Sequence, residues 1–338
     1  MKVFEHKSRF DLESGAYLPE LAITYSTYGK LNADKSNVVW VCHALTANSD
    51  AADWWNGIVG NNHVIDPDKY FIICANILGS CYGTTGPLSI NPETNHPYYN
   101  NFPLITVRDM VHAHILLRKH LEIDKINLLM GGSMGGYQAM EWCVMEQEVI
   151  DNLFLLATSA SESAWGIATH TAQRLSIEAD NTWNTPSPSA GAKGLKAARA
   201  IGMLTYRNYS IMVQQQTDSD PEKTDHYRAS SYINYQGDKL AQRFNAYSYW
   251  LLTKTMDSHH LGRGRGGNLG KVLLAISQRT LIIGISSDIL CPLIEQKFLA
   301  QHMPHSTLIE IDSNYGHDGF MVESIAISKH LAQWLENT

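Results

Sequence analysis

Short apolar runs recur along the chain, and each is bounded by turn residues. They are rich in Val, Ile and Leu and show little alternation, which is typical of strands buried on both faces of a sheet. The first run is different because its residues alternate, which fits an antiparallel start. The predicted strands are 21–25, 37–42, 70–75, 126–130, 153–156, 280–284 and 306–311.

Segments whose apolar residues recur at helical spacing lie between these runs. The spacing predicts helices over 106–121, 134–145 and 324–334. Because strands alternate with helices, we expect an α/β protein with a mainly parallel, doubly wound sheet.

The stretch 181–268 interrupts this rhythm. It opens with a Pro- and Ser-rich loop at 181–189 and continues with polar, Tyr-rich helical segments such as 195–206 and 239–256. It ends in a run of Gly and Arg at 262–267, which we expect to act as a flexible joint. A chain of 338 residues also exceeds what one compact core usually absorbs. The predicted division is a core over 1–180, a helical lid over 181–268 and the rest of the core over 269–338.

The charge balance narrows the range of partners. Lys and Arg total 26 against 33 Asp and Glu, a formal net charge of −7. We expect no nucleic acid and no anionic membrane as partner, since both require a basic face, although a local basic pocket for a phosphate-bearing cofactor stays compatible with this balance. No apolar run is long enough to span a bilayer, and residues 1–7 lack the apolar part of a signal peptide, so we expect a cytoplasmic protein.

The number and spacing of the Cys and His residues do not indicate a disulfide scaffold or a metal site. Five cysteines are too few and scattered for a disulfide scaffold, and an odd number fits a reducing compartment. Cys74 and Cys81 are farther apart than the Cys-x-x-Cys spacing of zinc sites. The adjacent His259 and His260 lack the i, i+4 spacing of a metal pair on a helix. We therefore expect no metal.

The strongest local signal is a G-x-S-x-G pattern formed by Gly131, Ser133 and Gly135. It follows a predicted strand and opens a predicted helix, which is the context of a nucleophile elbow in α/β-hydrolases. Glycines permit the tight turn, and the helix N-terminus favours developing negative charge. The pattern predicts Ser133 as a nucleophile; a Gly-rich turn with a structural serine is the alternative.

A serine hydroxyl needs a base, and the base needs a carboxylate to orient it. In α/β-hydrolases these follow the nucleophile in the order acid, then histidine. Asp288 comes just after the predicted strand 280–284, and His317 comes just after 306–311. Both loops lie at the carboxyl edge of a parallel sheet, where such sites assemble. We predict a triad of Ser133, Asp288 and His317.

Two other candidates fit less well. Asp312 is closer to the histidine in sequence but ends the strand itself, and His43 precedes the serine. His43 fits better in a loop that binds the oxyanion, which requires two donors. We predict the backbone N–H groups of Met134, directly after the nucleophile, and of Leu45, in the loop after strand 37–42. The alternative, which this segment alone does not exclude, is an ordinary strand-to-helix turn.

One motif matches a dinucleotide-binding pattern but lacks its structural context. Gly262, Gly264 and Gly267 satisfy G-x-G-x-x-G, but they follow a polar helix instead of a strand. No acidic residue follows at the distance that a dinucleotide site requires, so we expect no such site.

Several short motifs follow one another along nearly the whole chain: 43–46 (HALT), 74–87 (CANILGSCYGTTGP), 131–136 (GGSMGG), Ala198-Arg199, 205–207 (TYR), 235–237 (YQG), 262–267 (GRGRGG) and 316–318 (GHD). With these motifs in this order, the chain resembles the homoserine O-acetyltransferase family.

The resemblance implies an α/β-hydrolase fold with an inserted helical lid, and a homodimer formed through that lid. It also implies transfer of an acetyl group from acetyl-CoA, a co-substrate and not a bound cofactor, to the side-chain hydroxyl of L-homoserine, a step toward methionine. By position, Arg199 and Tyr206 match lid residues that face the amino-acid substrate, and Asp318 matches a residue near its ammonium group. A guanidinium suits the α-carboxylate, and a carboxylate suits the α-ammonium.

Two departures from the family pattern are Ala47-Asn48, where Gly-Asp is frequent, and Asn245, where aspartate is frequent. Some relatives use succinyl-CoA or acylate serine. A succinyl group would need a cation or strong donors nearby, and 79–87 contains no Lys or Arg, which favours acetyl. An esterase or thioesterase with the same triad, and a binding protein without catalysis, remain the competing hypotheses.

Overall fold

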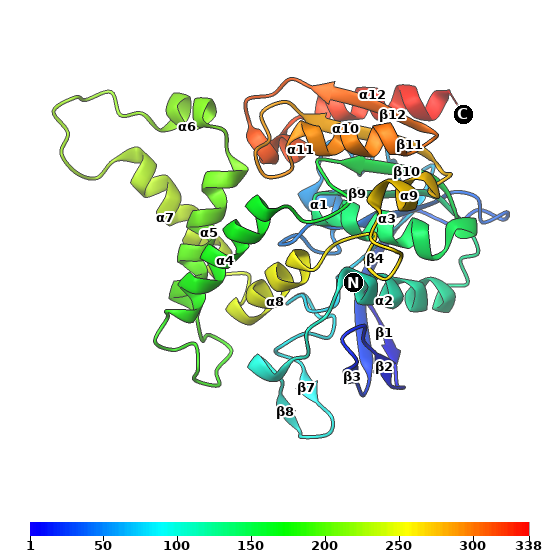
Figure 1. The fold of residues 1–338 in the computed structure, drawn as a ribbon, viewed down its shortest axis with the longest axis horizontal. Coiled ribbons are helices and arrows are strands. Elements are labelled where there is room, and N and C mark those ends of the chain that lie inside the picture. Colours follow the sequence, from blue (N-terminus) through cyan, green and yellow to red (C-terminus); the bar gives the residue numbers. More distant parts are fainter. Residues whose placement is uncertain (338) are drawn as a thin grey trace.

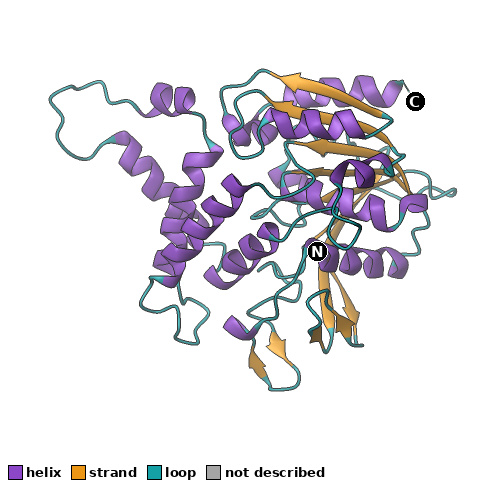
Figure 2. Ribbon diagram, in the orientation of Figure 1, coloured by secondary structure: helices purple, strands orange, loops and turns teal. Residues whose placement is uncertain are grey.

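The computed structural model describes residues 1–337, and its core is an eight-stranded sheet flanked by helices (Figures 1 and 2). The strand order is β1-β4-β6-β5-β9-β10-β11-β12. β4 pairs antiparallel with β1 and β6, and every other pair in this sheet is parallel. The strands are β1 Lys2–His6, β4 Leu21–Tyr28, β5 Val38–Cys42, β6 Phe71–Ala75, β9 Ile126–Gly132, β10 Ile150–Leu156, β11 Arg279–Ile285 and β12 Ser306–Ile311.

The core strands divide their side chains between two hydrophobic clusters, one on each face of the sheet. In β5, Val38 and Trp40 belong to one cluster and Val39 and Val41 to the other, as the two-residue period of a strand requires. The first cluster is covered by α2 (Val107–His120) and α3 (Met134–Met145), with α9 (Leu269–Leu274) and α10 (Leu293–His302). The second is covered by α1 (Ala51–Trp54) and α12 (Ser324–Glu336). The predicted α/β class and mainly parallel sheet are confirmed.

All seven predicted strands exist, with ends shifted by a few residues. The strand β1 was not predicted, because an exposed edge strand of polar and apolar residues carries no continuous apolar run. The short strands β2 (Phe10–Asp11), β3 (Tyr17–Leu18), β7 (Ile90–Asn91) and β8 (His96–Pro97) form two small hairpins outside the main sheet. No helix within residues 1–337 combines the length and apolarity needed to cross a bilayer.

A group of helices lies outside the sheet, most of them on the left of Figure 1. They are α4 (Ala164–Glu178), α5 (Ala192–Tyr206), α6 (Tyr209–Gln216), α7 (Arg228–Ala241) and α8 (Ala246–Asp257). Helix α4 precedes the expected lid boundary at residue 181, yet it packs against α5 and α8. We therefore propose that the lid begins at α4.

The expected helical segment 239–256 is two helices. Helix α7 ends at Ala241, and Asn245 caps the next helix by accepting a hydrogen bond from the Ser248 N–H at 2.8 Å. Asparagine is a favoured N-cap residue because its side chain satisfies a backbone donor that has no partner inside the helix. The break turns the chain back toward the core between α7 and α8.

The Gly-Arg segment 262–267 is fastened to the core, contrary to the expected flexible joint. The carboxylate of Glu141 accepts hydrogen bonds from Arg108 Nε at 2.8 Å and from Arg265 Nη1 at 2.9 Å. Arg263 pairs with Glu13 at 3.0 Å. The two arginines of this segment therefore act as structural anchors.

Candidate active site

Ser133 stands between the end of β9 and the first residue of α3. Its φ of 54° and ψ of −127° lie outside the common regions for a residue with a Cβ. The surrounding backbone holds it there: its N–H donates to the Leu156 carbonyl at 2.9 Å, and its carbonyl accepts from Thr158 Oγ1 at 2.8 Å. Strain that is maintained in this way is typical of functional sites.

Two glycines allow this turn because neighbouring backbone comes very close. A Cβ on Gly135 would lie 2.1 Å from the carbonyl oxygen of Cys42, and one on Gly131 would lie 2.2 Å from that of Gly135. Both contacts are with backbone, so neither is relieved by moving a side chain. The glycines of the pattern are therefore required by the packing of α3 against β5 and β9.

The structure brings Ser133, His317 and Asp288 together. His317 Nε2 lies 2.9 Å from Ser133 Oγ, and His317 Nδ1 lies 2.7 Å from Asp288 Oδ2. All three are buried, with exposed fractions of 7%, 4% and 4%. With Nδ1–H donating to the carboxylate, Nε2 is free to accept the serine proton.

The loop after β11 fixes the acid. Oδ1 of Asp288 accepts hydrogen bonds from the N–H groups of Leu290 at 2.8 Å and Cys291 at 2.9 Å, which leaves Oδ2 for the histidine. The alternative acid, Asp312, is exposed and accepts from Ser286 Oγ at 2.9 Å. It makes no hydrogen bond to His317, so the geometry favours Asp288.

Electrostatics prepare His317 to receive a proton. Burial disfavours its imidazolium, but the opposing attraction of Asp288, with smaller contributions from Asp318 and Glu162, is greater in sum. The pKa of His317 is therefore raised above the ordinary value, as a general base for a serine hydroxyl requires.

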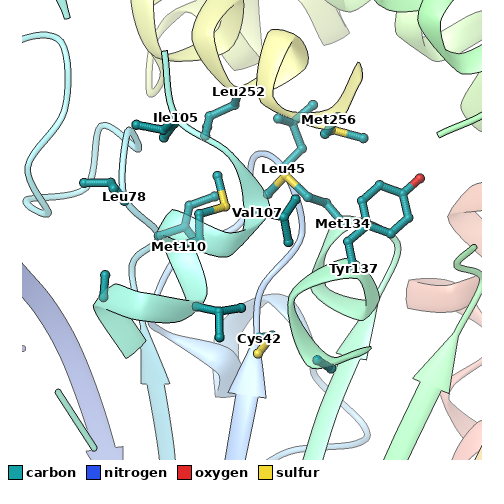
Figure 3. Close-up of a cluster of buried hydrophobic side chains, with 14 of the residues drawn as sticks. Cys42, Leu45, Leu78, Ile105, Val107, Met110, Met134, Tyr137, Leu252 and Met256 are labelled. Atoms are coloured by element: carbon teal, nitrogen blue, oxygen red, sulfur yellow. The ribbon is translucent and has the colours of Figure 1, made fainter. Parts of the chain in front are cut away.

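Leu45 and Met134 lie in one buried cluster beside Ser133, with Met256 of α8 nearby (Figure 3). Among residues 1–337, neither backbone N–H has a hydrogen-bond acceptor. Met134 is the first residue of α3, where an N–H has no partner inside the helix. These are the features that an oxyanion hole needs, although the predicted roles themselves stay predictions.

His43 holds the loop that carries Leu45. It is completely buried, and burial lowers its pKa to about 4, so the ring is neutral. Nδ1 donates to the Ala44 carbonyl at 2.8 Å and Nε2 accepts from the Ile77 N–H at 3.0 Å. The ring thereby joins the loop after β5 to the loop after β6.

A cavity of about 380 Å³ opens onto the serine. Its lining includes Arg199 and Tyr206 from α5, together with His317 and Asp318. The Arg199 Cζ lies 5.1 Å from the centre of the Tyr206 ring, and that ring lies 6.0 Å from the His317 ring. The predicted lid residues and the serine therefore share one cavity.

Several known proteins with similar sequences share one name. A family model described as alpha/beta hydrolase fold matches residues 37–324. The homoserine O-acetyltransferase of Cyclobacterium marinum is 48% identical over 95% of this chain and 91% of its own length. That of Chlorobaculum tepidum is 43% identical over 98% and 93%. The chain belongs to the homoserine O-acetyltransferase family.

Solved structures give the same fold with two activities in their names. The homoserine O-acetyltransferase of Staphylococcus aureus has a TM-score of 0.81 and 28% identity, covering 99% of this chain and 94% of that one. Esterase E22, as its L374D mutant, has a TM-score of 0.89 and 25% identity, covering 99% and 98%. The fold alone therefore does not separate a transferase from an esterase.

In this member of the homoserine O-acetyltransferase family, Asp318 has a protein partner that sequence reasoning missed. Arg207 Nε lies 2.9 Å from Asp318 Oδ2. Burial raises the pKa of Asp318, and the attraction of Arg207 and Arg199 opposes that rise. Arg207 directly follows Tyr206, so the need of a buried carboxylate for a cation was the signal that could have identified it.

Other conspicuous side chains have structural roles. His259 stacks on Tyr137 with ring centroids 4.0 Å apart, and its Nε2 donates to the Ser159 carbonyl at 3.2 Å. Burial lowers the pKa of His259 to about 3, so it stays neutral. Within residues 1–337, no group of three or more His, Cys, Asp or Glu is arranged to hold a metal ion.

Proposed function

We propose that this chain transfers an acetyl group from acetyl-CoA to the side-chain hydroxyl of L-homoserine through an acyl-serine intermediate, in the biosynthesis of methionine. The observation that carries the proposal is one cavity whose lining includes Ser133 and His317 of the triad together with an arginine, Arg199, and a carboxylate, Asp318. An amino-acid acceptor is a zwitterion, and these two charges match its two ends.

In the first half of the reaction, Nε2 of His317 removes the proton of Ser133 while Oγ attacks the thioester carbonyl. The tetrahedral oxyanion accepts hydrogen bonds from the N–H groups of Leu45 and Met134. Loss of one such donor typically lowers the rate by about 10²–10³. The C–S bond then breaks, the imidazolium returns its proton to the thiolate, and coenzyme A leaves.

In the second half, the α-carboxylate of homoserine binds Arg199 and Tyr206, and its ammonium binds Asp318. His317 removes the proton of the homoserine hydroxyl, which attacks the acyl-serine. The same two N–H groups stabilise the second oxyanion. Its collapse breaks the acyl–Oγ bond, the imidazolium of His317 returns its proton to Ser133 Oγ, and O-acetylhomoserine leaves. Holding the acceptor in this geometry favours it over water, and the lid excludes water from the cavity.

The test is loss of the acetyl-CoA thioester absorbance with and without L-homoserine, using Ser133→Ala as control. The proposal predicts that rapid loss requires homoserine and that Ser133→Ala is slower by at least about 10³-fold. Equal loss in water alone would identify an esterase or thioesterase, the activity named for esterase E22. Succinyl-CoA and L-serine, tested in the same assay, examine the choice of donor and acceptor.

We also propose a homodimer formed through the lid. Large apolar side chains of α5, α6 and α7 are exposed, including Leu204 at 63%, Tyr209 at 81% and Tyr235 at 59%. Helix α7 packs against both α5 and α6, and exposed apolar side chains on neighbouring helices are typical of an interaction site. Sedimentation should give twice the chain mass for the wild type and a monomer for Leu204→Asp.

We also propose that the protein works in the cytoplasm. All five cysteines are unpaired, which supports a reducing environment.

A further inference from the structure

The active-site cavity has a charged mouth that the mechanism above does not use. Its floor is formed by buried residues, among them Ser133 and His317. Three charged residues of its lining are exposed and therefore lie at its opening: Asp53, Lys239 and Arg243. Two cations and one carboxylate leave a local positive charge in a chain whose formal net charge is −7.

The two cations come from one turn of the lid. Lys239 lies near the end of α7, and Arg243 lies just beyond that end, where the chain turns toward α8. Residues four apart on a helical turn face the same side, which agrees with their place on the same cavity. A ligand entering the cavity would meet both.

Neither cation is neutralised by the protein. Among residues 1–337, no carboxylate lies within ion-pair distance of Lys239 or Arg243. The neighbouring carboxylate of Asp238 is taken by Lys196 at 2.9 Å. The arginine donates through Nη1 to two uncharged oxygens, the Thr46 carbonyl at 2.6 Å and the Tyr82 hydroxyl at 2.5 Å. Its charge is thereby positioned but not cancelled.

The chemistry of the acyl donor fits this arrangement. A coenzyme A thioester must present its carbonyl to the buried Ser133, while its phosphate groups, at the far end of a long flexible arm, stay outside. Lysine binds phosphate as a point charge, and arginine does so through several directed N–H groups. We propose that Lys239 and Arg243 bind the phosphate groups of the acyl donor at the mouth of the cavity; this rests on the proposed acetyl transfer.

Arg243 also connects the proposed phosphate site to the loop that carries Leu45. Its contact with the Thr46 carbonyl is one residue from Leu45, whose N–H is the proposed oxyanion donor. Binding of phosphate at the arginine would thus hold the lid and the oxyanion loop together while the thioester lies on the serine. For this reason Arg243 is a poor test variant, and Lys239, which has no such contact, is the informative one.

The experiment compares two donors with saturating L-homoserine: acetyl-CoA, and S-acetyl-N-acetylcysteamine, which has the thioester but no phosphate. In Lys239→Ala the ratio of kcat/KM for acetyl-CoA to kcat/KM for the short donor should fall about tenfold, the size of one charged hydrogen bond near a surface. Lys239→Glu should lower it further, and Asp53→Asn should raise it. Lys254→Ala, an exposed lysine of α8 outside the cavity, is the matched control and should leave it unchanged.

An unchanged ratio in Lys239→Glu would overturn the inference, and so would an equal fall for both donors, which would indicate a structural role. Calorimetry with free coenzyme A separates this from failure of the proposed function. If the wild type transfers acetyl from neither donor, about tenfold weaker binding of coenzyme A by Lys239→Glu would still support the phosphate site. Equal binding by both proteins, or none by the wild type, would refute it.

Discussion

Arg207 Nε lies 2.9 Å from Oδ2 of Asp318, the residue that directly follows the proposed catalytic base. The pair is largely buried, with side-chain exposures of 20% and 10%. An ammonium group that reaches Asp318 therefore meets a carboxylate already held in place, and it does not have to order that side chain itself. Pre-ordering of this kind reduces the entropic cost of binding.

Asp318→Asn should raise the KM for L-homoserine by about 10- to 100-fold, because a charge-assisted hydrogen bond to the ammonium is lost. Steady-state kinetics with homoserine as the varied substrate measure this. The burst of coenzyme A release, which reports only the first half-reaction, serves as the control and should change much less. An unchanged KM for homoserine would remove Asp318 from the acceptor site.

The pH dependence of kcat/KM for acetyl-CoA should report His317. Although burial disfavours the imidazolium, Asp288 and Asp318 raise the pKa of His317 above its ordinary value of 6.5. The protonated ring cannot accept the serine proton, so activity should fall as pH decreases, with a midpoint above 6.5. Asp318→Asn removes one of the nearby negative charges and should move this midpoint to lower pH. A midpoint that stays in place would mean that another group controls the rate.

Much of this arrangement follows from local sequence, and the remainder depends on contacts between distant segments. The turn at Ser133 is encoded within a few residues by an apolar strand and closely spaced glycines. Asp318 and Arg207 pair although they lie 111 positions apart in the sequence (318 − 207). No pattern of apolar and polar residues along the chain predicts such a pair. The proposed start of the lid at α4 is of the same kind, because it rests on the packing of α4 against α5 and α8.

Replacement of Ser133 should separate activity from stability. Both Ser133→Ala and Ser133→Gly remove the proposed nucleophile, but only glycine relieves the positive φ of 54°. We expect the glycine variant to be more stable than the alanine variant by about 1 kcal/mol, the cost of this backbone region for a residue with a Cβ. Urea unfolding of the two inactive proteins provides the comparison. If alanine is as stable as glycine, the elbow does not store strain.

Glu141 should be a stability residue without a direct part in the reaction. Its side chain is 3% exposed and forms ion pairs with Arg108 and Arg265, which fasten the Gly-Arg segment to the core. Glu141→Gln leaves the largely buried guanidinium of Arg265 without its charge partner and leaves Arg108 paired with Glu13 alone. The expected loss is about 2–4 kcal/mol of unfolding free energy, near the lower part of the range for broken buried pairs, since both arginines keep some contact with water.

The matched control is Glu310→Gln. Glu310 pairs with Lys297 at 2.9 Å, but these side chains are 47% and 53% exposed, and such surface pairs contribute about 0–1 kcal/mol. Both variants replace a glutamate by a glutamine. The difference between their losses of unfolding free energy in urea therefore reports the effect of burying the ion pair. Similar losses in both would mean that the Gly-Arg segment is not fastened through Glu141.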